Sequence, residues 1–317
     1  NWVKQRYDLI VTKEVINFVP GIVPGIGMAM NCFTQKGDKV MIQPPVYHPF
    51  AWVTTRNERT LVINPLRWEN GMYRMDLDAF REQIKGCKLF ILCNPHNPGG
   101  VVWTEAELRA IADICYDEKV LVFSDEIHAD LTLPPHTHRP FATVSEKARM
   151  NSVTFMSPSK AFNMPGLSAS HALIFNEDLR KRFRIYMDAG ELDMGHVFAF
   201  LSVEAAYSHG TEWLDQCLAY IQGNIDFVDE FLKKHAPKIK AIRPEASYLV
   251  WLDCRELELS QKDLNEFFVD KAHLALNDGE MFGKEGIGFM RLNVASPRCI
   301  IEKAMKQLAD AYQLYIK

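Results

Sequence analysis

Short runs of consecutive apolar residues alternate with longer stretches of helical periodicity between about residues 39 and 175. Uninterrupted apolar runs are typical of strands buried on both faces, and their alternation with amphipathic helices indicates a parallel sheet covered by helices. We therefore predict a three-layer α/β/α domain built on a mainly parallel sheet. Its strands are expected at residues 40–42, 61–63, 89–92, 120–123, 153–155 and 172–175.

The clearest helix of this region is expected at residues 105–117. Leu108, Ile111, Ala112 and Cys115 recur there at helical spacing. Thr104 can cap the first turn, with a glutamate three residues further on to complete a capping box.

Beyond about residue 176 the pattern changes to long helical segments, of which residues 212–234 form the longest. The remainder predicts a small α+β unit. Its strands are expected at 241–242, 248–252 and 289–294, and its helices at 263–271 and 298–312. We expect a large domain at residues 1–220 and a small carboxy-terminal domain at 221–317.

Composition and charge exclude several classes of partner. The net charge of −4 and the scattered lysines and arginines give no basic stripe for nucleic acid. No apolar run approaches the roughly 18 residues of a membrane span. Seven cysteines without a CxxC pair indicate free thiols and a cytoplasmic location. The segment that starts at Asn1 has no features of a signal peptide. No two histidines have the spacing of a zinc site, and we therefore expect no metal.

Polar residues follow three neighbouring predicted strands. Asn97 lies in N-P-H-N-P-G-G, Asp125 in S-D-E-I-H and Lys160 in S-P-S-K. Taken singly, these residues are equally compatible with a turn, a helix cap and a solvated lysine. Because the carboxyl ends of parallel strands meet at one edge of a sheet, we expect the amide, the carboxylate and the amine to lie together there.

This combination is typical of a site for pyridoxal 5′-phosphate (PLP). The amine of Lys160 can form a Schiff base with the cofactor aldehyde, and a carboxylate at Asp125 can keep the pyridine nitrogen protonated. Strand alternation sends the adjacent Glu126 to the opposite face.

A phosphate needs backbone N–H groups at a helix start, which the segment P-G-I-V-P-G supplies at Ile22 and Val23. The hydroxyl groups of Ser157 and Ser159 are two further expected donors to the phosphate.

The order of N-P-H-N-P-x-G, S-D-E-x-H and S-x-S-K resembles the class I/II aminotransferase superfamily of fold-type I PLP enzymes. The separations of 28 residues from Asn97 to Asp125 and 35 from Asp125 to Lys160 are also similar to that superfamily. The chain is most similar to the cystathionine beta-lyase or cysteine-S-conjugate beta-lyase branch (MalY/PatB type). This similarity rests on V-P-G-I-V-P, Q-P-P-V-Y-H-P-F, C-N-P-H-N-P-G-G-V-V-W and S-D-E-I-H-A-D-L.

The resemblance implies further roles. Tyr47 is expected to stack on the pyridine ring, Asn97 to bind the ring hydroxyl and the substrate, and Arg291 in F-M-R-L-N-V-A to bind the substrate α-carboxylate. Two positions depart from the superfamily's common pattern: His128 replaces a tyrosine of aminotransferases, and Ser168 replaces an arginine that contacts the phosphate. Both departures favour the lyase branch.

The implied activity is α,β-elimination of an S-substituted cysteine to pyruvate, ammonia and a thiol. An aminotransferase is the main alternative, because it shares every step up to removal of the α-proton, and a non-catalytic regulatory protein on the same fold is a lesser one. The resemblance also implies a homodimer, and an amino-terminal part of the small domain that this chain lacks.

Overall fold

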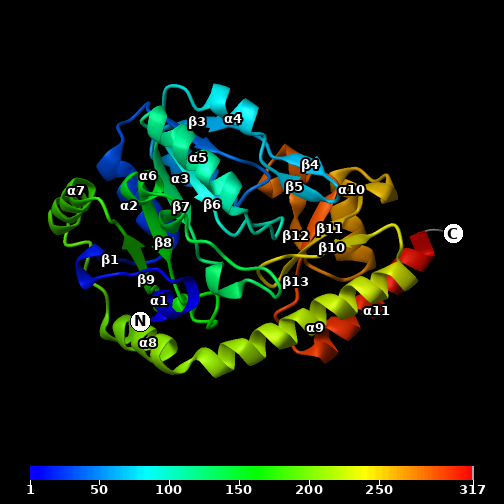
Figure 1. Ribbon diagram of the computed structural model, residues 1–317. Helices are drawn as coiled ribbons and strands as arrows, with labels where there is room; N and C mark the ends of the chain where they lie inside the picture. Colours follow the sequence, from blue (N-terminus) through cyan, green and yellow to red (C-terminus); the bar gives the residue numbers. More distant parts are fainter. Residues whose placement is uncertain (316–317) are drawn as a thin grey trace.

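Five neighbouring parallel strands make up most of the larger sheet in the computed structural model, which describes residues 1–315 (Figure 1). In spatial order they are β3 (Thr60–Ile63), β2 (Lys39–Ile42), β6 (Cys87–Cys93), β7 (Leu121–Asp125) and β8 (Ser152–Met156). Next to β8, β9 (Ser170–Leu173) and β1 (Ile16–Val19) complete the sheet, each antiparallel to its neighbour.

The last strand expected in the large domain is therefore antiparallel rather than parallel. Parallel neighbours need a crossover that is usually a helix, whereas β8 and β9 are joined by a loop whose only regular element within the described chain is the short turn η4 (Pro165–Leu167). β1 was not predicted, because the polar Asn17 interrupts its short apolar run.

Helices cover both faces of this sheet, as predicted. α2 (Ile22–Phe33), α3 (Pro49–Arg56) and α7 (Glu177–Asp188) pack on one face, and α4 (Leu77–Gln83), α5 (Glu105–Asp117) and α6 (Glu146–Met150) on the other. In β6, Leu89 and Ile91 face the first group while Phe90 and Leu92 face the second. The capping box of α5 is present, with Thr104 accepting from the backbone N–H of Glu107.

β3 departs from the expected pattern of full burial. It lies at the edge of the sheet, with β2 as its one neighbour, and Ile63 is 44% exposed. An apolar run in the sequence does not distinguish an edge strand from a central one.

A second, antiparallel sheet lies in the carboxy-terminal part of the chain, in the order β10 (Lys240–Ile242), β11 (Leu249–Asp253), β13 (Phe289–Asn293) and β12 (Asn277–Asp278). α9 (Thr211–His235) and α11 (Arg298–Tyr315) pack together against it (Figure 1). The predicted small α+β unit is confirmed. The predicted boundary between residues 220 and 221 lies inside α9 and stays a prediction.

The expected helix at 263–271 is present as α10 (Gln261–Glu266) followed by the wider turn η6 (Phe267–Lys271). No helix within residues 1–315 is both long and apolar enough to cross a membrane.

The two sheets are connected by contacts that position the later site. Gly100, directly after the N-P-H-N-P-G motif, has a φ of 68° and accepts from the backbone N–H groups of Glu245 and Ala246. A Cβ added there would lie 2.5 Å from Pro244 Cβ. Because only glycine combines this backbone conformation with so close an approach, Gly100 fixes the loop of Asn97 against the carboxy-terminal part.

Candidate active site

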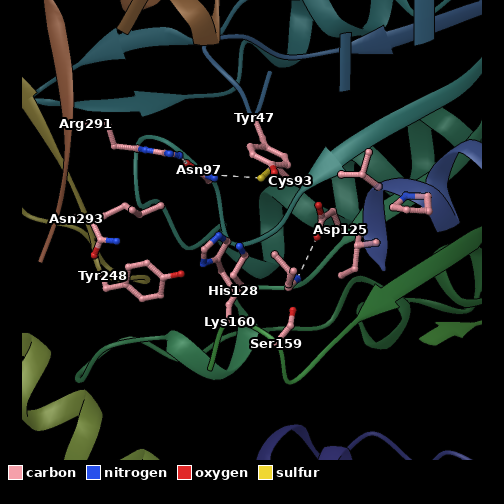
Figure 2. Close-up of a pocket in the computed structure, with 15 residues that line it drawn as sticks. Tyr47, Cys93, Asn97, Asp125, His128, Ser159, Lys160, Tyr248, Arg291 and Asn293 are labelled. Carbon is pink, nitrogen blue, oxygen red and sulfur yellow. Dashed lines mark hydrogen bonds between the residues drawn. The ribbon is translucent and has the colours of Figure 1, made fainter. Parts of the chain in front are cut away.

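A cavity of about 380 Å³ lies at the carboxyl ends of β6, β7 and β8 (Figure 2). Both parts of the chain contribute to its lining. The lining residues are Ile22, Val23, Pro24, Tyr47, Cys93, Asn97, Asp125, Ile127, His128, Ser159, Lys160, Tyr248, Leu249, Arg291 and Asn293.

Of the residues predicted to form the site, Ser157 alone does not line this cavity. It is buried, and its hydroxyl donates to the carbonyl of Ala169 at 2.7 Å and accepts from the backbone N–H of Ser159. Ser157 therefore supports the loop that carries Ser159 and Lys160. Its expected contact with a phosphate stays a prediction.

Asp125 is the last residue of β7 and is 4% exposed. Its Oδ1 accepts from the backbone N–H of Ile127 at 3.1 Å. The pKa of this carboxyl is raised to about 7: burial raises it most, the Ile127 N–H lowers it, Glu126 raises it and Lys160 lowers it. A buried acid of this kind is stabilised as a carboxylate when a cation, such as a protonated ring nitrogen, lies beside it.

Glu126 lies on the other side of the strand, as alternation predicts. Its oxygens accept from Ser124 Oγ and from the backbone N–H of Phe141, and lie 2.8 Å from His138 Nε2. These contacts hold the end of β7 on the side away from the cavity. Glu126 does not line the cavity.

The first turn of α2 closes one end of the cavity. α2 begins at Ile22, so the N–H groups of Ile22 and Val23 have no carbonyl partner within the helix. Gly21 before it has a φ of 116°, which favours glycine. Free N–H groups and the helix dipole make this end suited to an anion, with Ser159 among the lining residues.

No additional cation comes from Ser168, the position at which the superfamily pattern has an arginine. Ser168 is exposed, ends η4 with a φ of 48° and does not line the cavity. At the start of α2, the described residues that line the cavity therefore offer an anion backbone N–H groups and a hydroxyl.

His128 lines the cavity beside Lys160 (Figure 2). Burial, and then the positive charges of Lys160 and Arg291, lower the pKa of this imidazole to about 3, so it is neutral. Within residues 1–315, its buried Nδ1 has no hydrogen-bond partner. Because buried polar atoms are normally paired, this atom marks a place where a polar ligand atom completes the site.

Arg291 extends into the cavity from β13 of the smaller sheet (Figure 2). There it contacts Asn97, in the loop that follows β6 of the larger sheet. Its guanidinium donates to Asn97 Oδ1 at 2.9 Å and to Asn277 Oδ1 at 2.8 Å, and lies 4.7 Å above the Phe282 ring. Burial lowers its pKa, and within the described chain its buried Nε has no partner. The guanidinium is thus oriented in advance, with a donor left for a carboxylate.

Sequence reasoning missed Cys93, Tyr248, Leu249 and Asn293 among the lining residues. Cys93 directly precedes the first N-P pair, and Asn293 follows Arg291 by two residues on the same strand face, so both had a positional signal. Tyr248 and Leu249 had none, because nothing local in the sequence indicates that the start of β11 meets the large sheet.

Comparison with known proteins agrees with this geometry. Residues 1–308 match the family model described as aminotransferase class I and II. Cystathionine beta-lyase PatB of Bacillus subtilis is 38% identical over 98% of this chain and 81% of its own length.

Two solved structures are similar over nearly the whole chain. Cystalysin from Treponema denticola, which contains a PLP cofactor, is 34% identical, with a TM-score of 0.97 over 100% of this chain and 80% of its own. The PLP-bound C-S lyase from Staphylococcus hominis is 33% identical, with a TM-score of 0.91 over 98% of this chain and 80% of its own.

Proposed function

This chain belongs to the aminotransferase class I and II family, and on that premise we propose that it is a PLP-dependent carbon–sulfur lyase. Its substrates are S-substituted cysteines, and its products are pyruvate, ammonia and a thiol. The family expected from the sequence motifs, and the fold-type I architecture, are confirmed. The observation that supports the activity most strongly is the convergence of Asp125, Lys160 and Arg291 on one cavity.

The residues of this cavity fit PLP from end to end. The start of α2 suits its phosphate, Asp125 suits its ring nitrogen, and the ring of Tyr47 lies over the space between them and Asn97 (Figure 2). The Oδ1 of Asn97 is engaged by Arg291, so its Nδ2 is the group free to donate to the ring hydroxyl. When bound, PLP supplies an aldehyde that condenses with amines and a ring that withdraws electrons from the substrate Cα.

The protein's own groups then perform three tasks. Arg291 binds the α-carboxylate, which orients the substrate with its Cα–H bond toward Lys160. The Nζ of Lys160 accepts the α-proton as a general base and returns a proton to the departing sulfur when the Cβ–S bond breaks. Tyr47, Tyr248 and Leu249 reduce the access of water to this space.

A product assay distinguishes lyase from aminotransferase. With the PLP-loaded full chain and S-methyl-L-cysteine, we expect pyruvate and free thiol to appear in equal amounts without an added keto acid. Keto-acid production that depends on an amino acceptor, without release of thiol, would instead assign an aminotransferase. Bound cofactor without any turnover would favour the regulatory alternative.

Substitution of Arg291 by lysine should weaken substrate binding rather than cofactor binding. The bidentate contact to the carboxylate and the contact to Asn277 are lost, although the charge is kept. We expect KM to rise about 10- to 100-fold, corresponding to a charged hydrogen bond of about 1.5–3 kcal/mol. Steady-state kinetics test this, and a KM unchanged within twofold would exclude Arg291 as the carboxylate group.

We also propose that the protein is a cytoplasmic homodimer. Its seven cysteines are free, which suits a reducing compartment.

An apolar surface is exposed along the start of α8 (Val197–His209), where Phe198 is 67% exposed and Phe200 contacts Phe18 of β1. Because β1 leads directly into α2, a second copy on this surface would lie beside the phosphate end of the cavity. Light scattering of wild type and Phe198→Asp tests the proposal, which requires a dimer that the substitution weakens.

A further inference from the structure

A second cavity of about 320 Å³ adjoins the active site at Lys160. Most of its own walls are apolar, and Asn163, Tyr220 and Ser296 add polar groups; we call it the apolar lobe. Its apolar lining residues are Leu131, Ala161, Pro165, Trp213, Cys217, Ile221, Ala295 and Pro297. The lobe and the active-site cavity share Ser159, Lys160, Tyr248 and Asn293 as lining residues. The two spaces therefore meet at the side chain of the proposed general base.

The lobe offers a charged ligand no counter-charge that the reaction leaves free. Among the described residues that line it, Lys160 is the one charged side chain, and the reaction already employs it. The nearest neighbouring cation along the chain, Arg298, is engaged elsewhere: its Nε donates to Asn224 Oδ1 at 2.8 Å, and its guanidinium lies over the Phe227 ring.

The inner walls of the lobe are apolar and fixed. Leu131, Ala161 and Ile221 are buried. Trp213 is stacked on Phe162, with ring centroids 5.8 Å apart. A space of this kind favours an uncharged, apolar group.

The position of the lobe relative to Arg291 indicates which part of a substrate reaches it. Arg291 and Asn97 lie together on one side of the cavity, and Lys160 lies apart from them, toward the wall shared with the lobe (Figure 2). A cysteine conjugate with its carboxylate at Arg291 and its α-hydrogen at Lys160 places Cβ and sulfur beside Lys160. The substituent on sulfur then extends past Tyr248 and Asn293.

We propose that the apolar lobe binds the S-substituent, and that this enzyme prefers cysteines with an uncharged alkyl or aryl group on sulfur. This inference rests on the proposed lyase activity and specifies its substrate class. Cystathionine, whose leaving half carries its own ammonium and carboxylate, should be a poorer substrate. Its two charges would lie in a space that offers them no counter-charge apart from Lys160.

The test compares S-methyl-, S-propyl- and S-pentyl-L-cysteine with L-cystathionine on the PLP-loaded full chain, with pyruvate as the readout. All four release alkyl thiols, so the chemistry of C–S cleavage is matched. We expect kcat/KM to rise about fourfold for each methylene that the lobe buries, and cystathionine to fall at least about tenfold below S-pentyl-L-cysteine. Dissociation constants of straight-chain amino acids without a leaving group, read from the cofactor absorption band, should fall in parallel with chain length.

A filled lobe should remove this preference. Cys217 is half-buried in the lobe, and Cys217→Phe should lower kcat/KM for S-pentyl-L-cysteine about tenfold more than for S-methyl-L-cysteine. Cys299→Phe is the matched control, because Cys299 is exposed on α11 and lines neither cavity. Thermal unfolding of both variants verifies that they fold.

The two possible failures give different results. Pyruvate from every substrate, with kcat/KM independent of chain length or highest for cystathionine, overturns the assignment of the lobe and leaves the lyase activity intact. Absence of pyruvate from all four substrates overturns both proposals.

Discussion

Replacement of Lys160 by alanine is expected to lower kcat/KM for cleavage of an S-alkyl cysteine by on the order of 10⁴-fold. Among the described residues that line the active-site cavity, Lys160 carries the one amine, and the substitution removes it. The other basic group there is the guanidinium of Arg291. No other side chain there is placed to take the α-proton and to return it to sulfur. The visible absorption band of lysine-bound cofactor should disappear together with the activity.

Lys36→Ala serves as the matched control for this prediction. Lys36 is an exposed lysine paired with Glu58 on the surface, and it does not line the active-site cavity. It should keep both the absorption band and the activity. A Lys160→Ala protein that retained either one would show that the amine had been assigned wrongly.

Replacement of Asp125 by asparagine is expected to weaken cofactor binding about 10- to 100-fold. Asparagine keeps the size and the contact to the Ile127 N–H but loses the charge that would stabilise a protonated ring nitrogen. A hydrogen bond to a charged group is worth about 1.5–3 kcal/mol, which gives this range. Titration of the apoprotein with PLP measures the change, and Asp113→Asn, at an exposed carboxylate on α5, is the control.

The same substitution should change how the stability of the cofactor-free protein depends on pH. The carboxyl of Asp125 has a pKa of about 7 in the folded protein, against about 4 in an unfolded chain, so the unfolded state loses its proton first as pH rises. This group therefore lowers stability progressively between about pH 4 and pH 7, by up to roughly 4 kcal/mol. Asp125→Asn lacks this contribution.

Urea unfolding of both apoproteins at pH 5 and pH 8 measures the difference. Wild type should lose more stability than Asp125→Asn between these two values. An equal change in the two proteins would mean that Asp125 is better solvated, or better paired, than its burial indicates.

The sequence predicted the residues that a local pattern can locate. Asn97, Asp125 and Lys160 each follow a recognisable buried strand, and parallel neighbours bring such positions to one edge of a sheet. Strand alternation allowed only one of Asp125 and Glu126 to reach the cofactor, and the register of the family motif chose Asp125. The structure places the side chain of Glu126 on the other side of β7, with Ser124 and Phe141.

Residues brought in by long-range packing were harder to predict. Arg291 was assigned by family resemblance, because its place opposite Asn97 depends on how β13 meets a loop 194 positions earlier in the chain. The same reason explains why Tyr248 was missed. For Ser157, the sequence shows two hydroxyls before Lys160 but not that one of them donates to the carbonyl of Ala169.

The sequence did not predict strand direction, because an apolar run does not show whether a strand is parallel or antiparallel to its neighbour. The run at 172–175 reads like the parallel strands before it, yet β9 is antiparallel to β8. Local sequence patterns also could not predict the contacts of Asn277 and Phe282 with Arg291. These contacts join β13 to β12 and to the turn η7 (Gly279–Phe282).

Borohydride reduction of the PLP-loaded full chain, followed by peptide mapping, tests the central claim most directly. The claim is that one amine, held in a cavity with Asp125 and Arg291, carries the cofactor. The account predicts the reduced pyridoxyl group on the peptide that contains Lys160. A label on any other lysine, or no label in protein that cleaves S-methyl-L-cysteine, would contradict it.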